Sequence, residues 1–475
     1  MSGSDGLVAG VVRNPGAPAG VVLRALTAVD RQQVWWAFGD TAQLTRDVAE
    51  AMIGHPDRRV RSAVAGNSHV DPVQRARLVT DPDWVVVARA VAGRRHSDGD
   101  PRPLTDEAYA RGLSWVMSCE GDGGGMLTRD EVLGEFISSQ DTPVHVLRSF
   151  CRRPEAELRL VSCQWWRGLS AAERVALTLD PVPGVRGHAR RVAIEARSCL
   201  TDIDWAPTGR GSESAISYRL LARADAERIV WGEAPARYRY YAAGNPHLPA
   251  DLVAVLGRDA DPAVRYRVSM RSEMTEGQRA AIDYRVPELA DLDDATRYDA
   301  RPMAGTPDTW ARSAHAGVRR IAACSGGLSG EARDVLVGDS DLGVRVLTCR
   351  HQAGVAPEVL LRAYRDFRGR GRGRLTWRPG FPTHGLARFA DDPDPGMREL
   401  VLRDPDAPAE VVVPLLADPE RCVRTALARH PALAGERLLA VLDDPELGPS
   451  AAANPALPVA VMHRILDAAG VPRLP

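Results

Sequence analysis

The chain contains no lysine, because all 61 of its basic residues are arginine. A lysine is required by the Walker A phosphate-binding loop, by the Schiff base of pyridoxal enzymes and by protein-kinase active sites. The composition therefore excludes these three classes of protein.

Motifs for metal binding and nucleophilic catalysis are absent as well. The seven cysteines are irregularly spaced without a C-x-x-C, and no two of the 11 histidines lie three or four residues apart. HExxH and GxSxG, signatures of zinc proteases and serine hydrolases, are missing too. We interpret Cys151 and Cys163 as buried structural thiols rather than nucleophiles. We therefore predict a non-enzymatic protein with no cofactor, no metal site and no catalytic residue.

Charge of one sign and long apolar runs are also lacking. The net charge of −1 creates no field that would attract the whole chain to nucleic acid or membrane. No stretch approaches the ~20 apolar residues of a membrane span, and the N-terminus does not resemble a signal peptide. An odd number of scattered cysteines is typical of reduced thiols. These features predict a cytoplasmic protein that does not bind membranes.

A repeated pattern is present instead, and residues 245–267 show it most clearly. An Asn-Pro pair predicts a turn, since the residue before proline avoids helical geometry. A Leu/Val stripe at i, i+3 and i+4 predicts a short helix that can end at Gly257. Asp259 or Asp261 can then cap a second short helix beginning at Pro262.

The second helix carries an apolar residue followed by arginine, and this pair recurs along the chain. Its spacing is 26 residues, as in 318 to 344 and 397 to 423, and gaps of 53 or 54 residues predict degenerate copies. A fixed period of this length is typical of solenoids, in which neighbouring units stabilise short helices. The copies are Val60-Arg61, Leu158-Arg159, Val185-Arg186, Val264-Arg265, Val318-Arg319, Val344-Arg345, Met397-Arg398 and Val423-Arg424, with Tyr238-Arg239 as a weaker member.

An acidic residue stands four positions before most of these anchor arginines, as in Asp261–Arg265. Acid before base at this spacing is favourable on a helix. We therefore interpret the anchor arginines as neutralised within their own helix. Arg186, Arg239 and Arg319 lack that acid and are the better candidates for a ligand-binding ridge.

The chain is expected to divide into three parts. The boundaries are N-terminal repeats over 1–95, an irregular helical segment with a Gly-rich loop over 96–150, and a main repeat array over 151–475 with insertions near 201–213 and 362–382. No stretch alternates apolar and polar residues cleanly, so the predicted fold class is all-α.

The combination of N-P-x-x-P, a Leu/Val helix, D-x-D-P and V-R at this period resembles the bacterial leucine-rich repeat variant (LRV) family. The resemblance implies a right-handed α-solenoid of two-helix repeats, one α and one 3₁₀, without β-strands. It also implies an interaction scaffold with no common activity. HEAT-like repeats are the near alternative, although those repeats are longer.

Two candidate binding clusters stand out. The Arg/Gly segment could clamp phosphates beside the stacking face of Trp377, or it could be a solvated insertion. The Arg/Tyr cluster has residue types favoured at binding hot spots. The residues are Arg368, Arg370, Arg372 and Arg374 in the first cluster, and Arg237, Tyr238 and Arg239 in the second. The tryptophan pairs Trp35-Trp36 and Trp165-Trp166 are interpreted as core or groove-lining residues.

Three functions remain open. The first is a scaffold that binds a partner protein or peptide on the solenoid surface. The second is a nucleic-acid-binding protein that uses residues 368–374. The third is a helical-repeat DNA glycosylase, for which Asp83-Trp84, Asp204-Trp205 and Asp308 with Trp310 would supply acids and aromatic residues. The sequence does not indicate the oligomeric state.

Overall fold

The computed structural model describes residues 3–28, 37–38, 44–67, 70–92, 104–119, 127–138, 142, 144–195, 199–200, 203–205, 212–290 and 305–473. These residues are mostly helical, which confirms the all-α prediction. Within them, no helix combines the length and the apolar character needed to cross a membrane.

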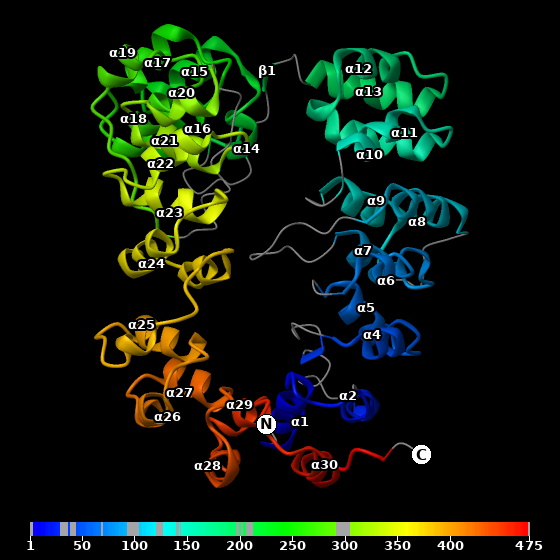
Figure 1. Ribbon diagram of the computed structural model, residues 1–475. Helices are drawn as coiled ribbons and strands as arrows, with labels where there is room; N and C mark the ends of the chain where they lie inside the picture. Colours follow the sequence, from blue (N-terminus) through cyan, green and yellow to red (C-terminus); the bar gives the residue numbers. More distant parts are fainter. Residues whose placement is uncertain are drawn as a thin grey trace. The chain divides into compact units, whose positions relative to one another are not determined.

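The chain forms two compact units, which are made of the helices labelled in Figure 1. Unit 1 consists of Met1–Leu177 and Thr383–Pro475, and unit 2 of Thr178–Pro382.

The described elements of unit 1 are mostly short helices. They are α1 (Gly3–Val12), α2 (Ala19–Ala25), η1 (Leu26–Ala28), α4 (Arg46–Ile53), α5 (Arg58–Ala65), α6 (Pro72–Arg75), η2 (Leu78–Thr80), α7 (Trp84–Ala92), α8 (Asp106–Ser118), α9 (Arg129–Ser138), α10 (Val144–Ser149), η3 (Phe150–Arg152), α11 (Ala156–Ser162), η4 (Cys163–Gly168), α12 (Ala171–Thr178), η7 (Ala387–Phe389), α25 (Pro395–Leu400), η8 (Val401–Arg403), α26 (Ala409–Val412), η9 (Val413–Ala417), α27 (Arg421–Ala428), α28 (Gly435–Leu442), α29 (Gly448–Ala452) and α30 (Val459–Ala468).

Unit 2 has the same character with one small strand pair. Its elements are α13 (Pro183–Glu195), β1 (Cys199–Leu200), α14 (Ser212–Ile216), β2 (Leu220–Leu221), α15 (Arg223–Val230), α16 (Ala236–Ala243), α17 (Ala250–Leu256), α18 (Pro262–Ser269), α19 (Glu276–Ala280), α20 (Pro307–Ala311), α21 (Ala316–Cys324), α22 (Gly330–Leu336), α23 (Leu342–His351), α24 (Pro357–Asp366) and η6 (Arg372–Trp377).

Strands β1 and β2 pair in parallel, with Cys199 opposite Leu220 and Leu200 opposite Leu221. The LRV resemblance implied an architecture without strands, so this pair is a departure from it. Each strand has only two residues, so the sequence contains no alternating pattern long enough to predict it.

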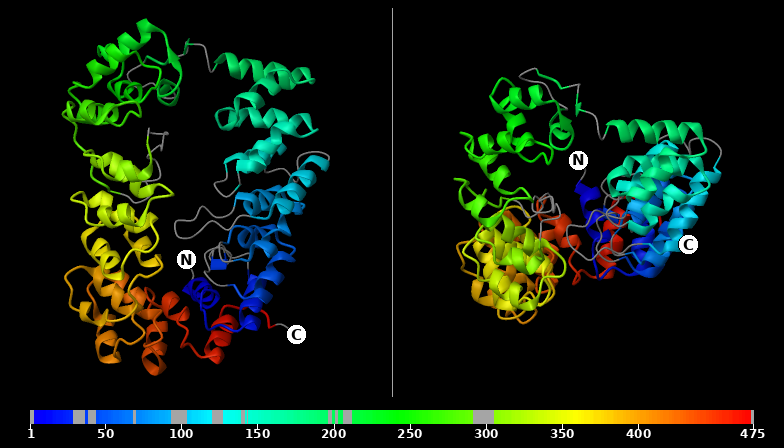
Figure 2. Two further views of the ribbon diagram at one scale, coloured as in Figure 1. Left: turned by 45° about the horizontal axis from the view of Figure 1, so that its top comes forward. Right: turned by 90° about the horizontal axis from the view of Figure 1, so that it is seen from above.

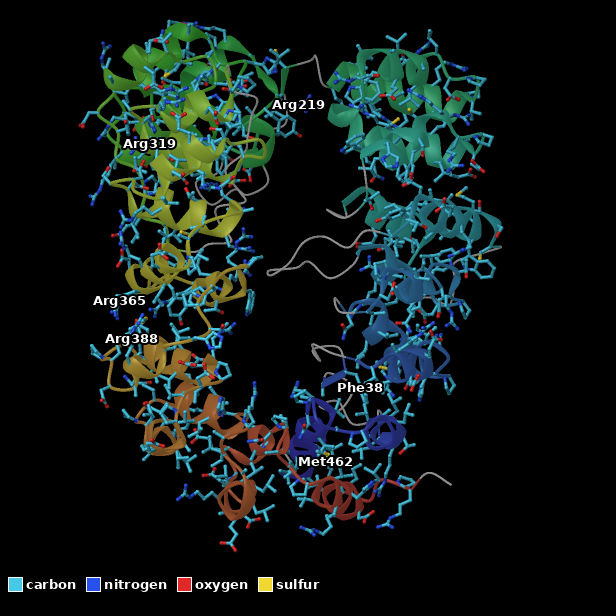
Figure 3. All side chains as sticks on the ribbon, viewed as in Figure 1. Phe38, Arg219, Arg319, Arg365, Arg388 and Met462 are labelled. Carbon is cyan, nitrogen blue, oxygen red and sulfur yellow. The ribbon has the colours of Figure 1, made fainter. Side chains whose placement is uncertain are left out.

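Helices two apart along the chain pack together. In unit 2, α15 contacts α17, α16 contacts α18, α20 contacts α22 and α21 contacts α23. The core therefore consists of apolar stripes that are buried between successive repeats. Phe38 and Met462, labelled in Figure 3, belong to the buried core of unit 1.

The D-x-D-P turn has two separate structural roles, which α18 illustrates. Asp261 is the N-cap, because its carboxylate accepts the backbone N–H of Ala263 at 2.8 Å, and Pro262 begins the helix. Asp259 in turn accepts the backbone N–H of Asp261 at 2.9 Å. The carboxylate of Asp259 also accepts a hydrogen bond from Nε of Arg239, in the preceding repeat, at 2.8 Å.

The anchor arginines are neutralised differently from the sequence-based interpretation. Four of them form ion pairs with the aspartate twenty residues later, at the start of the next D-x-D turn. The acid at i−4 instead caps the helix N-terminus, as Asp261 does. The prediction of pairing within one helix was therefore wrong for Arg61 and Arg398. Arg239 and Arg319, which have no acid at i−4, pair with the next turn in the same way. The pairs are Arg61–Asp81, Arg239–Asp259, Arg319–Asp339 and Arg398–Asp418, at 2.6 to 2.8 Å.

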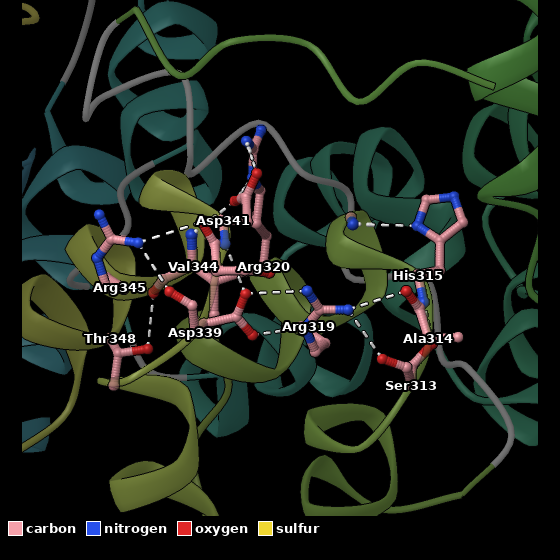
Figure 4. Close-up of polar contacts among 12 residues, drawn as sticks. Ser313, Ala314, His315, Arg319, Arg320, Asp339, Asp341, Val344, Arg345 and Thr348 are labelled. Carbon is pink, nitrogen blue, oxygen red and sulfur yellow. Dashed lines mark hydrogen bonds and ion pairs between the residues drawn. The ribbon is translucent and has the colours of Figure 1, made fainter.

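Most anchor arginines, including Arg61, Arg319 and Arg398 of these four, also close the turn before their own helix. Nη1 donates to the carbonyl oxygens five and six residues earlier, and Figure 4 shows this for Arg319 with Ser313 and Ala314. Such an anchor arginine therefore joins the turn of its own repeat to the turn of the next repeat. The arginines that make both bonds are Arg61, Arg159, Arg186, Arg265, Arg319, Arg345, Arg398 and Arg424.

Buried amide side chains form a second link between consecutive repeats. Asn245 Nδ2 donates to the carbonyl oxygens of Ile216 and Arg219, both at 2.7 Å. Asn454 and Gln352 make equivalent bonds to carbonyl oxygens 21 to 29 residues earlier. These bonds satisfy carbonyl groups at helix ends, where no intrahelical donor remains.

The first repeat of the chain makes the same kind of link to the last repeat, and both repeats belong to unit 1. Asn14 Nδ2 donates to the carbonyl oxygen of Ala452 at 3.0 Å and to that of Asn454 at 2.5 Å. Arg24, 3% exposed, forms an ion pair with Asp467. Helix α1 accordingly lies against α29 and α30 in unit 1 (Figures 1 and 2).

Candidate binding groove

The Arg/Gly segment, residues 368–374, continues from α24 into η6. Gly371 has a φ of 77°, a left-handed conformation that glycine adopts without strain and that starts η6. Arg372 Nε donates to the carbonyl oxygen of Tyr364 at 2.6 Å, and its guanidinium lies 4.0 Å from the centroid of that ring. The segment is therefore attached to α24 by both polar and cation–π contacts.

The remaining predicted residues of this segment differ in exposure. Arg368, Arg370 and Trp377 are exposed, whereas Arg374 is half-buried. These side chains all come from one short segment. A nucleic-acid role for the segment stays a prediction.

The Arg/Tyr cluster is part of the packing of unit 2. Tyr238 is fully buried, and its hydroxyl donates to the carbonyl oxygen of Asp204 at 2.5 Å. Arg237 forms an ion pair with Glu213 at 2.9 Å. Arg239 makes the link between units described above. All three side chains have a structural role that accounts for their position.

The tryptophans and cysteines considered from the sequence have similar explanations. Trp166 and Trp84 are buried, while Trp35-Trp36 lie outside the described residues. Burial raises the pKa of Cys151 above its usual value, which keeps the thiol protonated at neutral pH. These observations favour the core interpretation over the groove and nucleophile interpretations.

The sequence did not predict a cavity of about 590 Å³ in unit 2, between α17 and α19. Its volume lies within the range typical of ligand pockets, about 300 to 1,000 Å³. We call it the α17–α19 groove. Apolar and small side chains cover much of its surface, including Leu248, Val253, Ala254, Val268, Met274, Ala281 and Ile282.

Helix α19, on one side of the groove, is a short helix. Its five residues, Glu276–Ala280, compare with seven in α17 and α22, five in α20 and four in α26. After it the chain runs without regular structure through residues 283–290. Alongside the groove, α17 is therefore followed by a short helix and then by chain without regular structure. This is one of the degenerate copies that the long sequence gap indicated.

Contacts with the next units hold residues 283–290 in place. The Tyr284 ring stacks on His315, with centroids 3.9 Å apart and planes 18° from parallel. Arg320 Nη1 donates to the carbonyl oxygen of Pro287 at 2.7 Å. The backbone N–H of Arg370 donates to the carbonyl oxygen of Ala290 at 2.9 Å. The chain therefore leaves the groove to cover α21 and the Arg/Gly segment.

The groove has one neutralised end and one cationic end. At the first end, the buried Arg271 donates to the carbonyl oxygens of Ala243 and Asn245 and pairs with Glu273. Burial would raise the pKa of Glu273, but backbone and Arg271 hydrogen bonds outweigh it and leave the pKa below its usual value. Glu273 is therefore ionised and paired at neutral pH.

Arg258 lies at the other end, just after α17 ends. A methyl group added at the neighbouring Gly257 would lie 3.7 Å from Ile282, so α17 and the residues after α19 approach each other there. The Arg258 side chain is exposed, and among the described residues it has no hydrogen bond or ion pair. This guanidinium is available to an anionic group in the groove.

A buried serine–histidine pair beside the groove does not form a nucleophile. Ser269 Oγ lies 2.8 Å from His315 Nε2 and donates to the carbonyl oxygen of Tyr266 at 2.7 Å. His315 Nδ1 accepts the backbone N–H of Gly317, so Nε2 carries the ring proton and donates to Ser269. The histidine is not oriented to remove a proton from the serine.

His384, Asp404 and Asp406 also lie close together, with potential ligand atoms within 4.8 Å of one another. The buried Asp404 carboxylate accepts the backbone N–H groups of Leu386 at 2.6 Å and Ala387 at 3.3 Å. This capping role explains its position without a metal ion.

No protein-family model matches the chain, and no curated protein has a significantly similar sequence.

Proposed function

We propose that the chain is a non-enzymatic α-solenoid scaffold of the LRV type that binds a segment of a partner protein in the α17–α19 groove. The single observation that carries the binding role is the groove itself. It is large enough for several side chains, largely apolar, and lies between α17 and the short helix α19.

The solenoid arrangement is supported by links that recur at the repeat period. The anchor arginine and the buried amide each join one unit to the next at several places along the chain. In such an array contacts are made between adjacent units, and extended surfaces become available for partners. The right-handed superhelix and LRV membership are part of the same proposal.

Peptide binding to the full-length chain tests this function. A library of random 12-residue peptides is selected against the protein, and the dissociation constants of enriched peptides are measured by fluorescence anisotropy. Ala254→Trp places an indole on the exposed face of α17 inside the groove and should weaken binding at least tenfold. Ala440→Trp, the same change at an exposed position of α28 in unit 1, is the matched control.

Equal affinities of the enriched peptides for the wild type and Ala254→Trp would disprove binding in the groove. Circular dichroism and thermal unfolding of both variants establish that the tryptophans leave the fold intact.

A further inference from the structure

We infer, on the basis of the function proposed above, that the α17–α19 groove takes a short apolar protein segment that carries a carboxylate beside Arg258. The function proposed above requires only that a peptide binds; this inference specifies the chemistry of that peptide.

The shape of the groove requires apolar side chains that can approach α17 closely. Ala250, Ala254 and Gly257 lie at i, i+4 and i+7 on α17 and its C-cap, so they share one face of the helix. Behind them, the buried Val253 and Val268 supply an apolar floor. A segment with two apolar side chains about one helical turn apart would fit along this face of α17.

The charged residues of the groove determine which charge a bound peptide can place beside Arg258. The Arg271–Glu273 pair is internally neutral, and Gln278 is uncharged. Among the charged residues that line the groove, Arg258 is therefore the cation without an acidic partner in the described structure. A carboxylate placed there gains a charge-assisted hydrogen bond, whereas a lysine or arginine would be repelled.

The carboxylate could belong to an acidic side chain or to a chain terminus, and both have the same chemistry. A peptide whose C-terminus is amidated but whose glutamate is kept distinguishes the first source from the second. A partner segment with only apolar residues would lack the contact with Arg258.

Peptides enriched on the full-length protein provide the test. We expect them to combine two apolar residues with a carboxylate. Conversion of the peptide glutamate to glutamine, or amidation where the terminus is used, should weaken binding about three- to tenfold. Arg258→Glu should produce a similar loss, and a peptide with arginine in place of the glutamate should restore affinity for Arg258→Glu. Arg437→Glu, at an exposed position of α28, is the control for the change in net charge.

The outcomes separate the two proposals. Peptides that lose affinity for Ala254→Trp but lack a carboxylate, and that bind Arg258→Glu as well as wild type, would overturn the carboxylate requirement and leave the scaffold function standing. Peptides that bind Ala254→Trp normally would overturn both. Failure of the charge exchange to restore binding would also count against a direct contact with Arg258.

Discussion

At the scale of single residues, the most recognisable side chains of the repeat are structural. The anchor arginines looked available where no acid precedes them, yet Arg239 and Arg319 both pair with an aspartate of the next unit. Arg186 donates to the carbonyl oxygens of Asp180 and Pro181. Arginine suits this position because its guanidinium has five donors and can bind a carboxylate and two carbonyl groups together.

A buried histidine makes stability depend on pH. Burial, with a smaller effect from Arg279, lowers the pKa of His315 to about 4. The unfolded chain therefore binds a proton near pH 6.5 that the folded chain accepts only near pH 4. Stability from this group is complete above pH 6.5 and falls as the pH decreases towards about 4.

We expect the free energy of unfolding to fall by about 2 kcal/mol between pH 7.5 and pH 4.5 because of His315. Urea titrations of the wild type and of His315→Asn measure this effect. Asparagine keeps an acceptor for the helix N-terminus but does not titrate, so the variant should lose less stability over the same interval. Identical pH profiles for the two proteins would contradict the prediction.

At the scale of elements, a helix in this chain is defined by the turn before it. Neither helix of a unit has many residues, and short helices are marginal in water without tertiary contacts. The D-x-D turn supplies these contacts, since one aspartate caps the helix and the other accepts the arginine of the preceding unit. The stretch after helix α19 departs from the repeat, because residues 283–290 form no second helix.

The link between α25 and the turn before α27 can be measured with a double-mutant cycle. Arg398 and Asp418 are 12% and 3% exposed at the side chain and lie 2.7 Å apart. Arg398→Met or Asp418→Asn alone should cost about 2–3 kcal/mol, because each leaves a charged partner buried. The double variant should cost less than the sum of the two.

The control for this cycle is the exposed pair Arg223–Asp251, at 52% and 58% exposure. Its coupling energy should stay below about 1 kcal/mol. A coupling energy for Arg398–Asp418 no larger than that of the control would show that the link is not a main stabilising contact.

At the scale of the whole molecule, the first and last repeats of the chain, both in unit 1, are joined. The bonds of Asn14 to Ala452 and Asn454 repeat the pattern that Asn454 itself makes with the unit before it. In space, residues 3–28 therefore follow the last unit. This joint packs together repeats that are far apart in the sequence, in addition to the contacts between neighbouring repeats.

Loss of the joint should destabilise helices more than 400 residues away in the sequence. The double variant Asn14→Ala/Arg24→Ala removes two buried groups. These are the side-chain amide of Asn14, just after α1, and the guanidinium of Arg24 in α2. Hydrogen exchange followed by mass spectrometry should show faster exchange in α29 and α30 than in the wild type. Arg437→Ala, on the exposed face of α28, should leave those rates unchanged, and equal rates in the double variant would contradict the joint.

The sequence by itself determined the helical class, the repeat period, the turn that starts each second helix and the presence of degenerate copies. These are local properties, since apolar spacing, proline geometry and capping act within a few residues. The partners of the anchor arginines, the two-residue strand pair, the contact of the first unit with the last and the α17–α19 groove were decided only in the tertiary structure. Each depends on which backbone groups from distant residues meet, and a degenerate unit carries no local signal of the space it leaves beside its neighbour.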